Sequence, residues 1–156
     1  MKLLFKQRFF SWFSSYDIYD ETGNTVYRVE GQFAWGHKLH IHDANGAHIA
    51  TLRQQLLTWL NKYDLYLNDA ISATVCRRFS FLHPRYEVVP LEWTVEGDFM
   101  GWDYRITDAA GQVRGTASKE LLRWTDTYQI DVPDPDDALT VLAVVLSIDA
   151  DKAQQS

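Results

Sequence analysis

Four histidines gather on one predicted hairpin, at His37, His40, His42 and His48. On an extended strand His40 and His42 point to the same face, about 7 Å apart, with the carboxylate of Asp43 beside them. Such a set could hold zinc, but dedicated zinc sites have three or four ligands in tighter motifs. We therefore interpret these histidines as the polar outer face of a strand and expect no metal. The alternative is a metal-dependent site on this hairpin.

Basic residues from two parts of the chain could bind an anion. Lys6 and Arg8 share a face of the first predicted strand, and Arg77 and Arg78 lie on the strand that corresponds to it later in the chain. Arginine presents two parallel N–H donors to a phosphate, so the four residues would cradle an anionic ligand if both strands met at a barrel rim. The alternative is solvated charge that prevents strand edges from associating.

No residue set predicts catalysis. Arg77 and Arg78 could lower the pKa of Cys76, but no nucleophile motif accompanies it, and a small buried thiol is the simpler interpretation. Glu30-Gly31 recurs as Glu96-Gly97, which indicates a turn shared by two parts of the chain rather than an acid–base pair. Glycine-rich phosphate loops and dinucleotide fingerprints are lacking. We therefore predict a protein without enzymatic activity and without a cofactor.

Aromatic residues concentrate near the predicted turns. They could form a rim that touches a membrane interface, where tryptophan sits readily. They could equally close the ends of a barrel against water. Trp59 and Trp124 occupy equivalent repeat positions, which favours the structural interpretation. The residues concerned are Trp12, Phe13, Trp35, Trp59, Trp102 and Trp124.

Composition and charge restrict the class of protein. With 156 residues, 46% hydrophobic and 23% charged, the chain suits one globular domain with a substantial core. A net charge of −6 argues against nucleic-acid binding, which needs a basic footprint. A single cysteine and the lack of a signal-peptide pattern favour a reducing compartment. We expect a cytoplasmic location or a peripheral position at a membrane.

Short runs of alternating polar and apolar residues, separated by turn residues, predict a mainly β domain. Hairpins are expected at 16–30, 38–52, 63–79 and 104–118. The segment Asp-Ala-Asn-Gly at 43–46 returns as Asp-Ala-Ala-Gly at 108–111, and Trp59 returns as Trp124, each 65 residues later. These repeats predict two similar halves, approximately 1–69 and 70–132, each with about six strands.

The last apolar segment of the chain predicts a central helix over 135–150. Asp134 can cap its first turn, and Pro135 suits the first helical position. Between 138 and 148 only Thr140 and Ser147 are polar, so the helix must be buried on nearly every side. A barrel of about twelve strands is too wide to be filled by its own side chains. We therefore predict a closed antiparallel barrel around this helix, whose apolar run is well short of the roughly 20 residues that span a bilayer.

Several motifs along the chain also carry a family resemblance. They are Lys-Gln at 6–7 with Phe-Phe at 9–10, Val-Glu-Gly-Gln-Phe at 29–33, Lys-Leu-His-Ile-His-Asp at 38–43 with Gly46, Trp-Thr-Val-Glu-Gly-Asp at 93–98, Lys-Glu at 119–120, Trp-Thr-Asp-Thr-Tyr at 124–128 and the apolar helix. As a set they resemble the LURP-one-related branch of the tubby C-terminal-like superfamily. The resemblance implies a twelve-stranded closed barrel threaded by a hydrophobic helix, and it implies no enzymatic activity.

The same superfamily includes tubby-like proteins, which bind phosphoinositide head groups, and phospholipid scramblases, which are membrane-linked. No basic motif in this chain matches the head-group site of tubby, so no binding residue is carried over.

We therefore expect a single domain over 1–156 that acts as a non-enzymatic binding or scaffold protein. Its ligand would be a phospholipid head group, another anionic ligand or a protein partner at the barrel exterior. The alternatives are a metal-dependent enzyme with its site at a barrel end or on the histidine hairpin, and a structural or regulatory domain that acts through protein contacts alone.

Overall fold

The computed structural model describes residues 1–5, 15–32, 35–79, 83–121 and 126–155. In these residues twelve strands precede one helix, α1 (Ala138–Gln155), which follows a short 3-10 turn, Pro135–Asp137. The strands are β1 (Lys2–Phe5), β2 (Ser15–Tyr19), β3 (Thr25–Gln32), β4 (Lys38–Asp43), β5 (His48–Gln54), β6 (Lys62–Leu67), β7 (Ala70–Arg78), β8 (Arg85–Val89), β9 (Trp93–Asp98), β10 (Asp103–Thr107), β11 (Val113–Leu121) and β12 (Asp126–Asp131).

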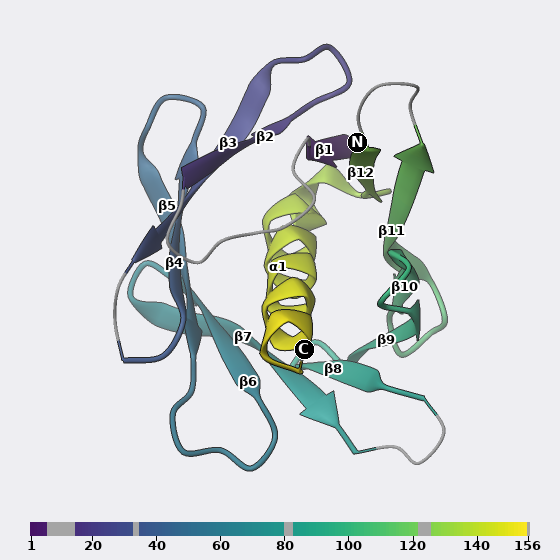
Figure 1. The fold of residues 1–156 in the computed structure, drawn as a ribbon. Coiled ribbons are helices and arrows are strands. Elements are labelled where there is room, and N and C mark those ends of the chain that lie inside the picture. Colours follow the sequence, from purple (N-terminus) through teal and green to yellow (C-terminus); the bar gives the residue numbers. More distant parts are fainter. Residues whose placement is uncertain (6–14, 33–34, 80–82, 122–125, 156) are drawn as a thin grey trace.

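The strands form a closed antiparallel barrel around α1, as the sequence predicts (Figure 1). Each strand pairs with its neighbours along the chain, and β1 pairs with β12 to close the sheet, with Leu3 opposite Ile130. Strand β6 ends at Leu67 and β7 begins at Ala70, so each predicted half carries six strands.

One turn type joins three of the hairpins, and its chemistry is readable in the sequence. The side-chain oxygens of Asp20, Asp43 and Asp108 each accept hydrogen bonds from the backbone N–H groups two and four residues later. The glycine three residues after each aspartate has a φ between 83° and 87°, a conformation that glycine adopts without steric cost. These turns fix the register of β2–β3, β4–β5 and β10–β11.

Helix α1 is the centre of the core. Asp134 accepts a hydrogen bond from the backbone N–H of Asp136, and Leu142 and Val144 have no exposed surface. The one polar side chain buried in its middle, Ser147, donates its hydroxyl to the carbonyl of Ala143 at 2.7 Å. The α-helix ends at Gln155 rather than at the predicted 150, because polar residues of its last turns bind the barrel wall.

At one position the wall can approach the helix only because it lacks a side chain. A Cβ atom at Gly115 on β11 would lie 2.7 Å from Cγ1 of Val141, so glycine is needed at that contact. In the part of the chain that the structure describes, no helix is long and apolar enough to cross a membrane.

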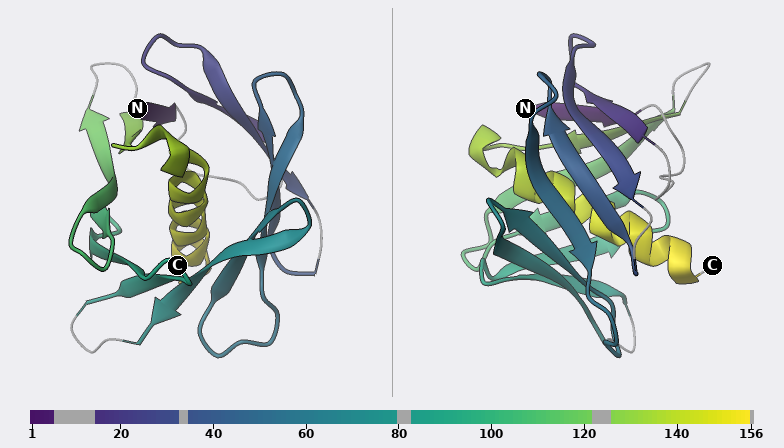
Figure 2. Two further views of the ribbon diagram at one scale, coloured as in Figure 1. Left: turned by 180° about the vertical axis from the view of Figure 1, so that it is seen from behind. Right: turned by 90° about the vertical axis from the view of Figure 1, so that its left-hand side faces the viewer.

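The barrel has two distinct ends (Figure 2). Because consecutive strands alternate in direction, the connections β1–β2, β3–β4, β5–β6, β7–β8, β9–β10 and β11–β12 share one end. The helix finishes there: Gln154 bonds Gln54, and the ammonium of Lys152 donates to the carbonyl of Phe99 at 2.8 Å. We call this the helix-exit end, and the opposite one, where Asp137 contacts Arg114, the helix-entry end.

Candidate functional site

Large apolar side chains are exposed on three neighbouring connections at the helix-exit end. We call them the apolar rim: Trp35, Leu56, Leu57, Trp59 and Phe79. Trp35 is 86% exposed and Trp59 is 90% exposed, and the ring of Trp59 stacks on that of Phe79 with centroids 6.4 Å apart. Leu57 is fully exposed and adopts a φ of 59°, which is strained for a residue with a side chain. Exposed apolar side chains grouped in this way are typical of interaction surfaces.

The rim corrects part of the expectation for the aromatic residues. Trp102 is 5% exposed and packs among other rings at the helix-exit end, as a plug against water would. Trp35 and Trp59 are not plugs, because they project from connections beyond the ends of the strands. The structural interpretation is therefore wrong for these two residues. Trp12, Phe13 and Trp124 lie outside the described residues.

Three basic residues lie beside the apolar rim. Lys38 begins β4, Arg53 lies near the end of β5 and Lys62 begins β6, and Lys38 is directly opposite Arg53 in the sheet. Like charges in this position repel each other. None of the three forms an ion pair within the described residues. Their charge is therefore available to an anionic surface.

Acidic residues gather instead at the helix-entry end, in the turns and around the start of the helix. They are Asp20, Glu21, Asp43, Asp69, Glu92, Asp108, Asp134, Asp136 and Asp137. The net charge of −6 is thus unevenly distributed, with these carboxylates concentrated at the helix-entry end.

The predicted anion site is only partly within the described residues, since Lys6 and Arg8 lie outside them. Arg77 and Arg78 occupy successive positions of β7 and so point to opposite faces of the wall. Arg77 faces the lumen, whereas Arg78 faces outward and donates from Nε to Glu87 at 2.8 Å. That bond holds the pKa of the Glu87 carboxyl below its ordinary value. The four-residue site remains a prediction.

A buried polar cluster under the helix-exit end was not predicted from the sequence. Asp151 of α1 has no exposed surface, and it accepts hydrogen bonds from Asn61 Nδ2 at 2.6 Å and from the hydroxyl of Tyr86. Arg77 Nη1 lies 3.7 Å from the same carboxylate. The pKa of Tyr86 is raised well above its ordinary value, mainly by burial and then by the hydrogen bond to Asp151. The only sequence signal was that Asp151, like Asp149, follows closely after the apolar run that ends at Ile148.

On β4 and β5, His40 and His48 contact each other, whereas His42 lies beside Glu30 instead. His40 Nδ1 lies 3.1 Å from His48 Nε2, and the hydroxyl of Thr51 contacts both rings, at 3.2 and 2.8 Å. His42 lies 3.5 Å from Glu30. Over the residues the structure describes, no group of three or more His, Cys, Asp or Glu side chains is arranged to hold a metal ion.

The His40 cluster should make stability depend on pH. The pKa of His40 lies below the ordinary 6.5, mainly because the ring is partly buried. The positive charges of His48, Lys38 and His42 lower it further, against a smaller opposing effect of Glu30. The unfolded chain then takes up a proton at a higher pH than the folded chain does, so the free energy of unfolding should fall as the pH drops below 6.5. His40→Gln should flatten this dependence in urea titrations, and an unchanged slope would contradict it. His37, whose pKa is also lowered by burial, should contribute separately.

Cys76 behaves as a buried small side chain. It is 3% exposed, and burial raises the pKa of its thiol despite the positive charges of Arg78 and Lys62. Gly97 has a φ of 141°, and a Cβ there would lie 2.5 Å from the carbonyl oxygen of Asp103. Glycine at 97 is thus required by the close approach of two strands, as expected. The predicted turn is wrong, however, because Glu96-Gly97 lies within β9 and Glu30-Gly31 within β3.

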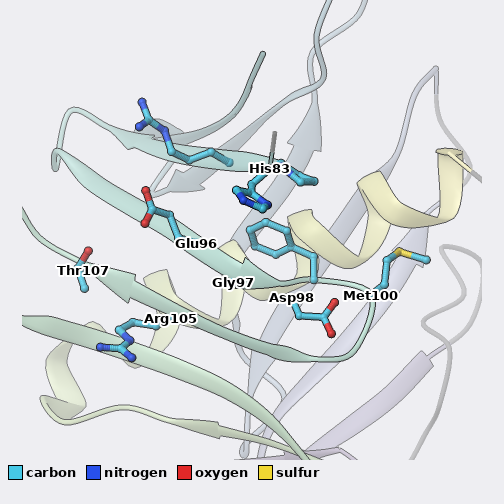
Figure 3. A pocket seen from close by; sticks show the side chains of 10 residues that line it. His83, Glu96, Gly97, Asp98, Met100, Arg105 and Thr107 are labelled. Atoms are coloured by element: carbon cyan, nitrogen blue, oxygen red, sulfur yellow. The ribbon is translucent and has the colours of Figure 1, made fainter. Parts of the chain in front are cut away.

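A groove of about 990 Å³ crosses the outer face of β8, β9 and β10 and reaches the helix-exit end (Figure 3). Its walls carry both signs of charge, with an apolar portion at one end. The residues that matter here are Arg85, Glu96, Asp98, Phe99, Met100 and Arg105. Sequence reasoning singled out Glu96-Gly97 and the segment at 93–98 but missed this groove, because the sequence does not show that β8 and β10 place Arg85 and Arg105 beside them.

Comparisons with known proteins agree with this architecture. The chain is 27% identical over 150 residues to YxjI, an uncharacterized protein of Bacillus subtilis (strain 168), covering 96% of this chain and 92% of that one. An X-ray structure of a protein from Arabidopsis thaliana superposes with a TM-score of 0.68 at 15% identity, over 96% of this chain and 90% of the other, and shows the same fold.

The sequence profile of the LURP-one-related family matches residues 1–149, nearly the whole chain. Neither the family description nor the names of the two similar proteins assigns an enzymatic activity. The chain belongs to the LURP-one-related family.

Proposed function

We propose that this protein binds peripherally to anionic phospholipid bilayers through the apolar rim. The exposure of Trp35, Leu57 and Trp59 on neighbouring connections of one barrel end is the observation that carries the proposal. Tryptophan and leucine side chains enter the boundary between head groups and acyl chains, where their transfer from water is favourable.

Charge supports the same orientation. Lys38, Arg53 and Lys62 lie beside the rim, and each basic residue near an anionic surface adds about 1 kcal/mol to binding. The acidic helix-entry end would face away from the bilayer. Docking in this pose requires no transmembrane segment and leaves the barrel folded around its helix.

Sedimentation with vesicles tests the proposal. The protein should sediment with phosphatidylcholine vesicles that contain phosphatidylserine, and less with phosphatidylcholine alone. Replacing Trp35 and Trp59 together by serine should weaken binding roughly tenfold or more, about 1.4 kcal/mol. Lys38→Glu with Arg53→Glu should remove the preference for phosphatidylserine and its dependence on salt.

The matched control is Ile71→Ser, which removes an exposed apolar side chain (55% exposed) near the helix-entry end. It should bind vesicles as the unmodified protein does. Equal recovery of the unmodified protein in the supernatant for every lipid would refute the proposal. Dissociation of an oligomer by the double tryptophan variant would show instead that the rim contacts protein.

A further inference from the structure

The groove on β8–β10 carries two opposite charges that do not neutralise each other. Glu96 on β9 is directly opposite Arg105 on β10, the position in which opposite charges of an antiparallel pair usually interact. Neither side chain forms an ion pair with any described residue. Figure 3 shows them on neighbouring strands, both bordering the groove. Both charges are thus free to meet a ligand.

The remaining charged residues of the groove repeat this alternation. Arg85 borders it on the β8 side, where its Nη2 donates to Glu87 at 2.9 Å. Asp98 borders it at the helix-exit end, where one carboxylate oxygen accepts from the N–H of Gly101 at 3.0 Å. A simple anion would therefore meet two carboxylates, and a simple cation would meet two guanidinium groups. Each would be partly repelled.

An apolar surface lies at the same end as Asp98. Phe99 is buried against Tyr86, whose ring centroid is 5.0 Å away, while Met100 is 78% exposed. Figure 3 shows Asp98 and Met100 together at this end of the groove. Methionine adapts its shape to varied apolar ligands. An apolar part of a ligand would therefore lie beside its positively charged group.

We infer that this groove binds a small zwitterion, in which an ammonium group is joined to a phosphate or carboxylate and to an apolar portion. Arg105 holds the anionic group with two parallel N–H donors, and Glu96 and Asp98 hold the ammonium. The volume of about 990 Å³ is at the upper end of the range for small-molecule sites. The inference goes beyond bilayer docking, because it concerns a different surface and a soluble ligand.

Titrations followed by amide NMR test it without any membrane. Glycerophosphoethanolamine represents a lipid head group, and L-phenylalanine represents a free metabolite with the same pair of charges. Glycerol 3-phosphate and ethanolamine carry one charge each. We expect at least one zwitterion to shift groove amides saturably and to bind at least tenfold more tightly than either single-charge probe. The zwitterion that binds identifies the source.

Charge-neutral variants make the test specific to the groove. Arg105→Gln and Glu96→Gln should each weaken binding at least threefold, whereas Arg28→Gln, on β3 at the far side of the barrel, should leave it unchanged. All three positions are exposed strand residues, and an NMR spectrum confirms folding before titration. The inference is overturned if no zwitterion gives saturable shifts, if a single-charge probe binds as tightly, or if the groove variants bind like the unmodified protein. Vesicle binding would be unaffected by any of these outcomes.

Discussion

Leu142→Asp should abolish folding. Leu142 lies in the middle of α1 with no exposed surface, surrounded on all sides by the apolar lining of the barrel. Truncating a buried leucine alone costs about 2–5 kcal/mol. An ionised carboxylate at the same place adds several kcal/mol more, because no described residue there could pair with it. The sum approaches the total stability of about 5–15 kcal/mol of a typical domain.

The matched control is Leu57→Asp, the same chemical change at a fully exposed residue of the apolar rim. Aspartate also tolerates the positive φ of this position better than leucine does. Circular dichroism should show cooperative thermal unfolding for Leu57→Asp and none for Leu142→Asp. A soluble Leu142→Asp protein that melts cooperatively would mean that the helix is not the core of the barrel.

Asp151→Ala should have the second-largest effect, a loss of roughly 2–4 kcal/mol in the free energy of unfolding. The substitution leaves Asn61 Nδ2 and the Tyr86 hydroxyl without their acceptor, and leaves Arg77 without its nearest carboxylate. Buried donors that lose their partner bear the full cost of removal from water. Urea-induced unfolding measures the change directly.

Asp103→Ala removes an exposed aspartate from β10 and should change stability by no more than about 0.5 kcal/mol. Combining Asp151→Ala with Tyr86→Phe should cost less than the two single changes together, since the two side chains share one hydrogen bond. If the stability losses of the two single variants added up exactly in the double variant, the hydrogen bond between the two side chains would not contribute. If Asp151→Ala left the free energy of unfolding unchanged, the cluster would not fix the end of α1.

Much of the fold was predictable because its signals are local. Asp43, Asn45 and Gly46 encode one turn by themselves, and the period-two pattern of β4 places Leu39 and Ile41 inside. The helix was predictable from its uniformly apolar composition. The end of the helix was not predictable, because a polar residue such as Asp151 usually marks the end of an apolar helix. Asp151 is instead held inside the barrel by Asn61 and Tyr86, which lie 90 and 65 residues away in the sequence.

The candidate sites were harder to predict because they depend on which face a side chain occupies. Arg77 and Arg78 are adjacent in sequence, yet one faces Asp151 in the lumen and the other faces Glu87 outside. Exposure of Trp59 depends on how far its connection extends beyond the strands, which composition does not encode. The groove arises from side chains of three strands, and the motif at 93–98 supplies only the side that β9 contributes.

Whether the helix-exit end meets a bilayer can be measured directly at position 57. With Cys76 replaced by alanine, an environment-sensitive fluorophore is attached to cysteine at position 57 in the apolar rim, or at position 109 in a turn of the helix-entry end. On addition of vesicles containing phosphatidylserine, emission from position 57 should shift to shorter wavelength and become protected from an aqueous quencher, while emission from position 109 stays unchanged. Unchanged emission at position 57, or the same shift at both positions, would contradict binding through the apolar rim.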